Sequence, residues 1–122
     1  SDVSTVTSVH TALKELLATF GASLNGLHSQ LMSAGLTIPA IDPLVQQVIT
    51  AANAPLSSSA ALDAQITALL AAINALWTTA SQIQARTDPV LYSQRHSEIA
   101  GELIALLEKT YTALVWLQEA LP

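Results

Sequence analysis

Residues 99–121 read IAGELIALLEKTYTALVWLQEAL, and their apolar residues recur at the spacing of an α-helix. Placed at 100° intervals with the residues that precede it, its apolar side chains cover an arc of roughly 180°, wider than the stripe of a helix that packs on one side only. The arc is formed by Leu91, Ile99, Leu103, Ile104, Leu106, Leu107, Tyr111, Leu114, Val115, Leu117 and Leu121. A helix this apolar has to contact several helices, a ligand or a second copy of the chain. Trp116 projects from the charged side, which favours an interface position for it.

The composition indicates one unusually apolar domain. Of 122 residues, 51% are hydrophobic and 11% are charged, whereas a soluble domain usually carries about 25% charged residues. We therefore expect a single domain over residues 1–122, and the mean hydropathy of +0.45 excludes a disordered chain. No run of about 18 apolar residues is present, so we expect no integral membrane segment. Nine acidic against four basic residues argue against nucleic acid as a partner.

Four helices are predicted, and no strands, because period-two alternation and glycine-rich hairpin turns are missing. The helices are expected at about Val3 to Ser33, Asp42 to Ala52, Ala60 to Ala85, and Val90 to the last residues. Helices of these lengths predict an all-α fold, an antiparallel bundle of three long helices and one short helix.

The predicted helix boundaries come from capping residues and from proline. Asp42 and Asp88 each precede a proline, so both are interpreted as N-caps followed by proline at the first helical position. Serines 57–59 supply a cap for the third helix. Gly21 and Gly26 lie inside the first helix, where they allow a bend or a close helix contact.

Polar residues occupy the apolar arc of the fourth predicted helix. His96 and Tyr92 fall within the arc, and Arg95 lies beside them. One interpretation is that these three side chains receive the polar head of an amphiphile, whose tail runs between the first, third and fourth helices. The alternatives are a buried His96 that donates to a backbone carbonyl and an Arg95 that pairs with Glu98 on the surface.

No sequence motif for catalysis or for a metal or cofactor is present. A Gly-x-Ser-x-Gly elbow, a His-Glu-x-x-His motif, a Walker loop and a Glu-x-x-His pair are all missing, and so is cysteine. His10 and His28 are expected at a solvated edge of the first helix, and neither they nor His96 have a carboxylate at metal-ligand spacing. We therefore expect no enzyme, no metal site and no cofactor.

Segments at the N-terminus and in the third predicted helix resemble a known family. The residue composition of three segments resembles that of the fungal hydrophobic-surface-binding family, which includes ligand-binding domains of cell-wall mannoproteins. The segments are Asp2-Val3-Ser4-Thr5-Val6-Thr7-Ser8-Val9, Ala72-Ile73-Asn74-Ala75-Leu76 and Thr79-Ala80-Ser81-Gln82. The resemblance implies an all-α protein, secreted or in the cell wall, that binds hydrophobic surfaces or fatty acids between its helices.

The function predicted from these features is non-catalytic binding of a fatty acid or another apolar small molecule in a cavity between helices. The residues expected to line it are Phe20, Leu24, Leu70, Ile73, Trp77, Leu103, Leu107 and Tyr111, with Tyr92 and His96 near the head group. The alternative is a structural module that homodimerises through the wide apolar face of the fourth helix. A third hypothesis is a surfactant-like protein that opens at an apolar interface.

Overall fold

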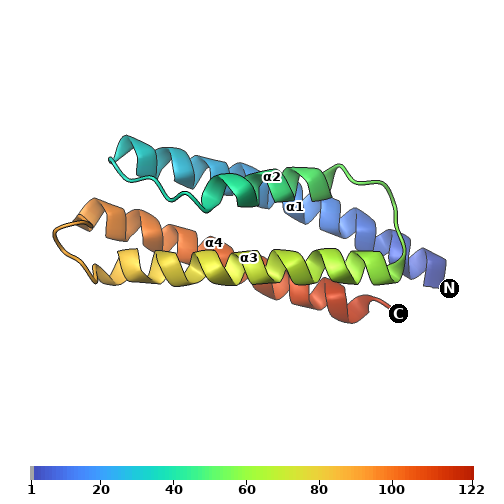
Figure 1. Ribbon diagram of the computed structural model, residues 1–122. Coiled ribbons are helices and arrows are strands. Elements are labelled where there is room, and N and C mark those ends of the chain that lie inside the picture. Colours follow the sequence, from blue (N-terminus) through green and yellow to red (C-terminus); the bar gives the residue numbers. More distant parts are fainter. Residues whose placement is uncertain (1) are drawn as a thin grey trace.

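Four helices make up the computed structural model, which describes residues 2–122 (Figure 1). They are α1 (Asp2–Ser33), α2 (Ile41–Ala52), α3 (Ser59–Ala85) and α4 (Gln94–Ala120). No strand occurs within residues 2–122, so the all-α prediction is confirmed. Successive helices run in opposite directions, and the short α2 lies along the middle of the molecule (Figure 1).

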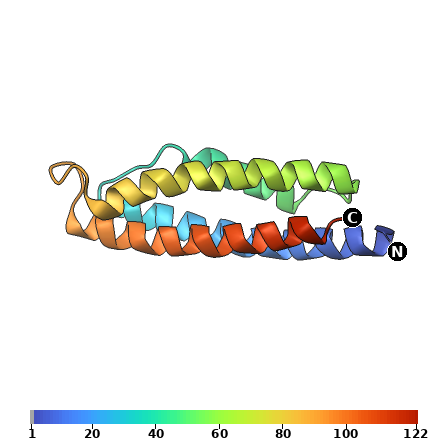
Figure 2. The ribbon, with the colours of Figure 1, turned by 90° about the horizontal axis from the view of Figure 1, so that it is seen from below.

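The wide apolar arc of α4 is explained by its position, because α4 packs against both α1 and α3 (Figure 2). Four residues of the arc are fully buried, and four more are partly buried against the same core. The first group is Ile99, Leu103, Leu107 and Leu114, and the second is Ile104, Leu106, Leu117 and Leu121. The homodimer hypothesis is based on the width of this apolar arc. Contacts of α4 with two helices of the same chain therefore account for that width.

The predicted start of α2 is wrong in detail. The helix begins at Ile41, and the residue at its N-cap, Ala40, makes no side-chain hydrogen bond to the helix. Asp42 lies within the first turn instead, where one carboxylate oxygen is 3.3 Å from Nε2 of the buried His28 on α1. A carboxylate near a helix N-terminus is also favourable for the helix dipole. The predicted serine cap of α3 is confirmed, since the Ser58 hydroxyl accepts the N–H of Ala61.

The predicted start of α4 is also wrong, because Asp88 closes a turn rather than a helix. Its carboxylate accepts the N–H groups of Val90 and Leu91, at 3.1 and 3.2 Å. The chain then leaves this turn, and α4 begins only at Gln94, with Ser93 as its N-cap. Val90 is 97% exposed and Leu91 is 57% exposed, so Leu91 does not belong to the buried arc.

Arg86 fixes the loop between α3 and α4. It ends α3 in the left-handed conformation, with φ at 50°. From this position its Nε donates to the carbonyl of Tyr92 at 2.8 Å, and Nη2 donates to the carbonyl of Pro89 at 3.4 Å. The loop is therefore held by its own side chains, although its Val90 and Leu91 are exposed.

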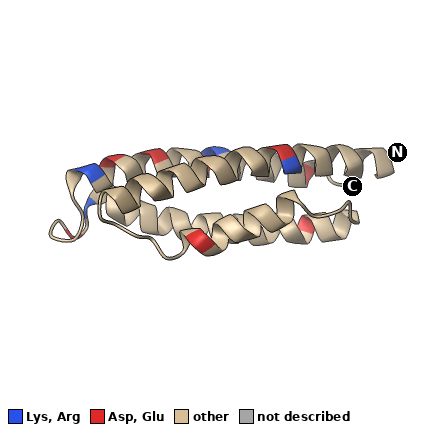
Figure 3. Ribbon diagram, turned by 90° about the horizontal axis from the view of Figure 1, so that it is seen from above, with Lys and Arg blue, Asp and Glu red and all other residues tan. Residues whose placement is uncertain are grey.

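Charged residues are sparse on α1, α2 and α3, whereas α4 carries six of them (Figure 3). Asp63 is the one charged residue within α3, and α1 carries no charge after Glu15. Among the described helices, α3 alone is long and apolar enough to cross a membrane by length and composition, and 28% of its most apolar window is buried. This finding does not support the expectation of no membrane segment, which stays a prediction.

We expect alanine at the two glycines inside α1 to change the free energy of unfolding differently. A Cβ at Gly26 meets no atom within 4 Å, whereas a Cβ at Gly21 lies 3.2 Å from a methyl group of the buried Val48 on α2. Gly26→Ala therefore raises the free energy of unfolding by about 1 kcal/mol through helix propensity. Gly21→Ala displaces Val48 and loses that gain. Urea unfolding of both variants measures the difference, and an equal gain from both would contradict the close contact between α1 and α2.

Candidate ligand-binding groove

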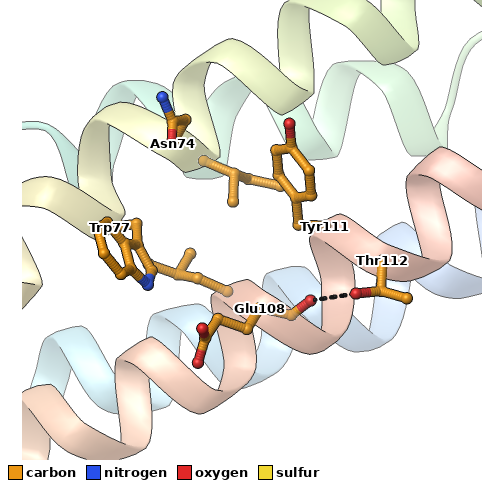
Figure 4. Close-up of a pocket in the computed structure, with 7 residues that line it drawn as sticks. Asn74, Trp77, Glu108, Tyr111 and Thr112 are labelled. Atoms are coloured by element: carbon orange, nitrogen blue, oxygen red, sulfur yellow. Dashed lines mark hydrogen bonds between the residues drawn. The ribbon is translucent and has the colours of Figure 1, made fainter.

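The outer seam between α3 and α4 opens into a groove with a volume of about 290 Å³ (Figure 4). Both helices contribute lining residues. They are Ile73, Asn74 and Trp77 from α3, and Leu107, Glu108, Tyr111 and Thr112 from α4. This volume is close to the lower limit of small-molecule sites, roughly 300 Å³.

The two helices line the groove with the same pattern of side chains. Ile73 and Trp77 are one helical turn apart on α3, and Leu107 and Tyr111 are one turn apart on α4, so each pair shares a face. Ile73 and Leu107 are at most 1% exposed and form the apolar floor. Trp77 is 39% exposed and Tyr111 is 40% exposed, and their rings stand on either side of the gap (Figure 4).

Hydrogen bonds between α3 and α4 flank the groove on both sides along the seam. Toward the loop, the Ser97 hydroxyl donates to the Gln84 carbonyl at 2.5 Å. Toward the chain end, Nε2 of Gln118 donates to the Thr67 hydroxyl at 2.8 Å. Gly101 assists the close approach near Gln84, because a Cβ there would lie 3.1 Å from the Gln84 side chain. The separation of the helices is thus set beyond both ends of the groove.

The rim of the groove carries polar groups that are not used within the protein. The Thr112 hydroxyl donates to the backbone carbonyl of Glu108 at 3.1 Å (Figure 4). By contrast, the side chains of Asn74, Trp77, Glu108 and Tyr111 have no hydrogen-bond or ion-pair partner within residues 2–122. An apolar floor with a few free polar groups above it is typical of a site for a small amphiphilic molecule.

The sequence-based prediction placed only part of this groove. Four of the ten predicted residues line it, namely Ile73, Trp77, Leu107 and Tyr111. Phe20, Leu24 and Leu103 are at most 1% exposed and pack in the core, and Leu70 packs partly buried against it. These four residues contribute to the packing of the bundle and not to the lining of the groove.

His96 has a structural role that accounts for its burial. Its Nδ1 accepts the N–H of Ser93 at 3.1 Å, and the Ser93 hydroxyl accepts the N–H of His96 at 3.1 Å, which forms a capping box at the start of α4. With Nδ1 as the acceptor, the hydrogen lies on Nε2, which donates to the carbonyl of Ala34 at 2.7 Å. The structure therefore confirms the alternative prediction, in which a buried His96 donates to a backbone carbonyl.

The predicted head-group residues lie far from the groove. His96 precedes Tyr111 by fifteen residues on α4, which corresponds to about 22 Å along the helix. Tyr92 lies still further away, in the loop before α4, where it packs partly buried against the core and its carbonyl accepts from Arg86. Arg95 forms no ion pair with Glu98 in the described part of the chain. His96 and Tyr92 therefore do not share one site with Trp77 and Tyr111.

The expectation that His10 and His28 are solvated is wrong. They are only 9% and 4% exposed, because α1 has neighbouring helices on more than one side. The Nδ1 atoms of both have no hydrogen-bond partner within residues 2–122. No three His, Cys, Asp or Glu side chains of the described chain gather into a group that could hold a metal ion.

Sequence reasoning missed the polar half of the groove, formed by Asn74, Glu108 and Thr112. A signal for two of these residues is present, because Asn74 directly follows Ile73 and Glu108 directly follows Leu107. The same order of aliphatic, polar and, three residues later, aromatic residue thus occurs on both helices. Only the pairing of α3 with α4 shows that the two patterns face one another.

Comparison of the chain with protein-family models, with curated proteins and with solved structures finds no match. The resemblance to the hydrophobic-surface-binding family, with the secreted or cell-wall location that it implies, therefore stays a prediction from the texture of the sequence.

We predict that His96→Gln lowers the free energy of unfolding by about 1–2 kcal/mol, because the Ala34 carbonyl loses its donor. Glutamine at this position can keep the bond to the Ser93 N–H, so the variant isolates the link between α1 and α4. Thermal unfolding monitored by circular dichroism measures the effect. Arg95→Gln, at an exposed neighbouring position, serves as the control and is expected to change the free energy by less than about 0.5 kcal/mol. Equal stability of the two variants would contradict the structural role.

Proposed function

We propose that the chain is a non-catalytic binding protein that holds the apolar part of a small amphiphile in the groove between α3 and α4. The groove would be carried by a single antiparallel bundle of three long helices and one short helix. The observation that supports this proposal most strongly is the pair of half-exposed aromatic rings, Trp77 and Tyr111, over the buried aliphatic floor of Ile73 and Leu107. A ligand that covers half-exposed aromatic side chains buries their apolar surface, and this burial stabilises the complex.

The proposed ligand site lies at the outer seam between α3 and α4, whereas the sequence-based prediction placed it in the interior of the bundle. Phe20, Leu24 and Leu103, which an interior cavity would expose to the ligand, are buried against other residues of the core. A protein interior is packed as densely as an organic crystal, so an acyl chain could enter there only by displacing these side chains. The seam needs no such rearrangement.

The proposal predicts saturable binding of a non-ionic amphiphile, decyl glucoside, below its micelle-forming concentration. Trp77→Ala and Tyr111→Ala are each expected to weaken binding about tenfold, because each removes one wall of the groove. Isothermal titration calorimetry measures the affinity, and native mass spectrometry counts the molecules bound per chain.

Trp116→Ala is the matched control for the aromatic substitutions. Trp116 is also on α4 but is 70% exposed and lies outside the groove, so its loss is expected to leave the affinity unchanged. A weakening as large as that of Trp77→Ala would show that binding is a general property of exposed aromatic residues. Absence of any saturable binding would overturn the proposed function.

A further inference from the structure

The geometry points to a groove that selects amphiphiles with a cationic head group, such as a quaternary ammonium, over those with an anionic head group. This inference rests on the proposed function, because it assigns the head-group class for the same site. The observation that carries it is the charge of the lining residues. Within the described chain, Glu108 is the only charged residue that lines the groove.

The Glu108 carboxylate is not neutralised by the protein. No Lys or Arg side chain pairs with a carboxylate within residues 2–122, and the contact of His28 with Asp42 lies elsewhere in the molecule. Lys109 follows Glu108 in the chain, but successive residues of a helix project about 100° apart, and Lys109 does not line the groove. The opposite wall supplies no cation either, since α3 contains no basic residue. A cation in the groove would therefore meet an unpaired carboxylate.

The aromatic walls favour the same class of head group. The faces of indole and phenol rings carry partial negative charge and attract cations, and quaternary ammonium groups are recognised in this way. In Figure 4 the side chain of Glu108 extends toward the end of the groove where Trp77 lies, so a carboxylate and an aromatic ring border the same space. An alkyl tail would then lie over Ile73 and Leu107.

An anionic head group meets the opposite situation. A fatty-acid carboxylate placed beside Glu108 is repelled by it, and no lining residue offers a compensating positive charge. The net charge of −5 adds a further unfavourable contribution at low ionic strength. The fatty acid expected from the sequence is thus the less favoured ligand of this groove.

The test compares three molecules that share a decyl tail: decyltrimethylammonium, decyl glucoside and decanoate. All measurements use the variant Trp116→Phe. The chain has two tryptophans, so this substitution leaves Trp77 as the only one, and tryptophan fluorescence then reports on the groove alone. Below the micelle-forming concentrations, decyltrimethylammonium is expected to bind about tenfold more tightly than decanoate, and added salt reduces the difference.

Two matched substitutions identify the source of the selectivity. Glu108→Gln is expected to remove most of the preference for decyltrimethylammonium over decanoate, and its affinity for decyl glucoside measures separately what the substitution does to the uncharged contacts of the groove. Glu102→Gln changes the net charge equally but lies outside the groove on α4, so it should keep the preference. Equal loss of the preference in both variants would assign it to net charge and overturn the inference.

The remaining outcomes separate this inference from the proposed function. If decyl glucoside binds and the cation and the anion bind equally well, or the anion binds more tightly, the inference is wrong and the proposed function stands. If decyl glucoside does not perturb Trp77 while the cation does, binding is by charge alone and the proposed function fails. If none of the three molecules perturbs Trp77, both are wrong.

Discussion

The helix α4 packs against two helices at once, and the other features of the bundle follow from this double contact. Its apolar residues extend over about half of the helix circumference, so burying only one side would leave a wide apolar surface in water. Contact with α1 covers one part of the arc, and contact with α3 covers the other. Because the side chains of three helices meet there, the interior is filled with aliphatic residues and Phe20.

The groove follows from how this packing ends at the surface. The seam between α3 and α4 is joined by hydrogen bonds at Gln84 and at Thr67, and between them lie large aromatic residues. Trp77 and Tyr111 lie between these two hydrogen bonds along the seam. They remain half-exposed above Ile73 and Leu107, which produces an apolar depression with a polar rim.

Periodicity predicted most of the helices, because the spacing of apolar residues is a local property of the chain. It located α1 and the C-terminal ends of α2 and α3 closely. The capping signals at Asp42 and Asp88 were misleading for two different reasons. Asp88 closes a turn with the same carboxylate-to-backbone hydrogen bond that would cap a helix. Asp42 lies inside the first turn of α2, where its carboxylate contacts His28 on α1. The burial of His28 and the polar rim at Glu108 depend on which helices become neighbours, and the local spacing of apolar residues does not show this.

Every residue of the groove comes from α3 and α4, which follow each other in the chain and are joined by the loop that Arg86 holds. A helical hairpin of this kind requires the closure of only a short loop, which is the least costly step in chain entropy. The hydrogen bond from His96 to Ala34, by contrast, joins residues 62 positions apart. Contacts between near neighbours form early in folding. The order of assembly expected from this topology therefore places the groove before the docking of α1, so its shape is set by one contiguous half of the chain.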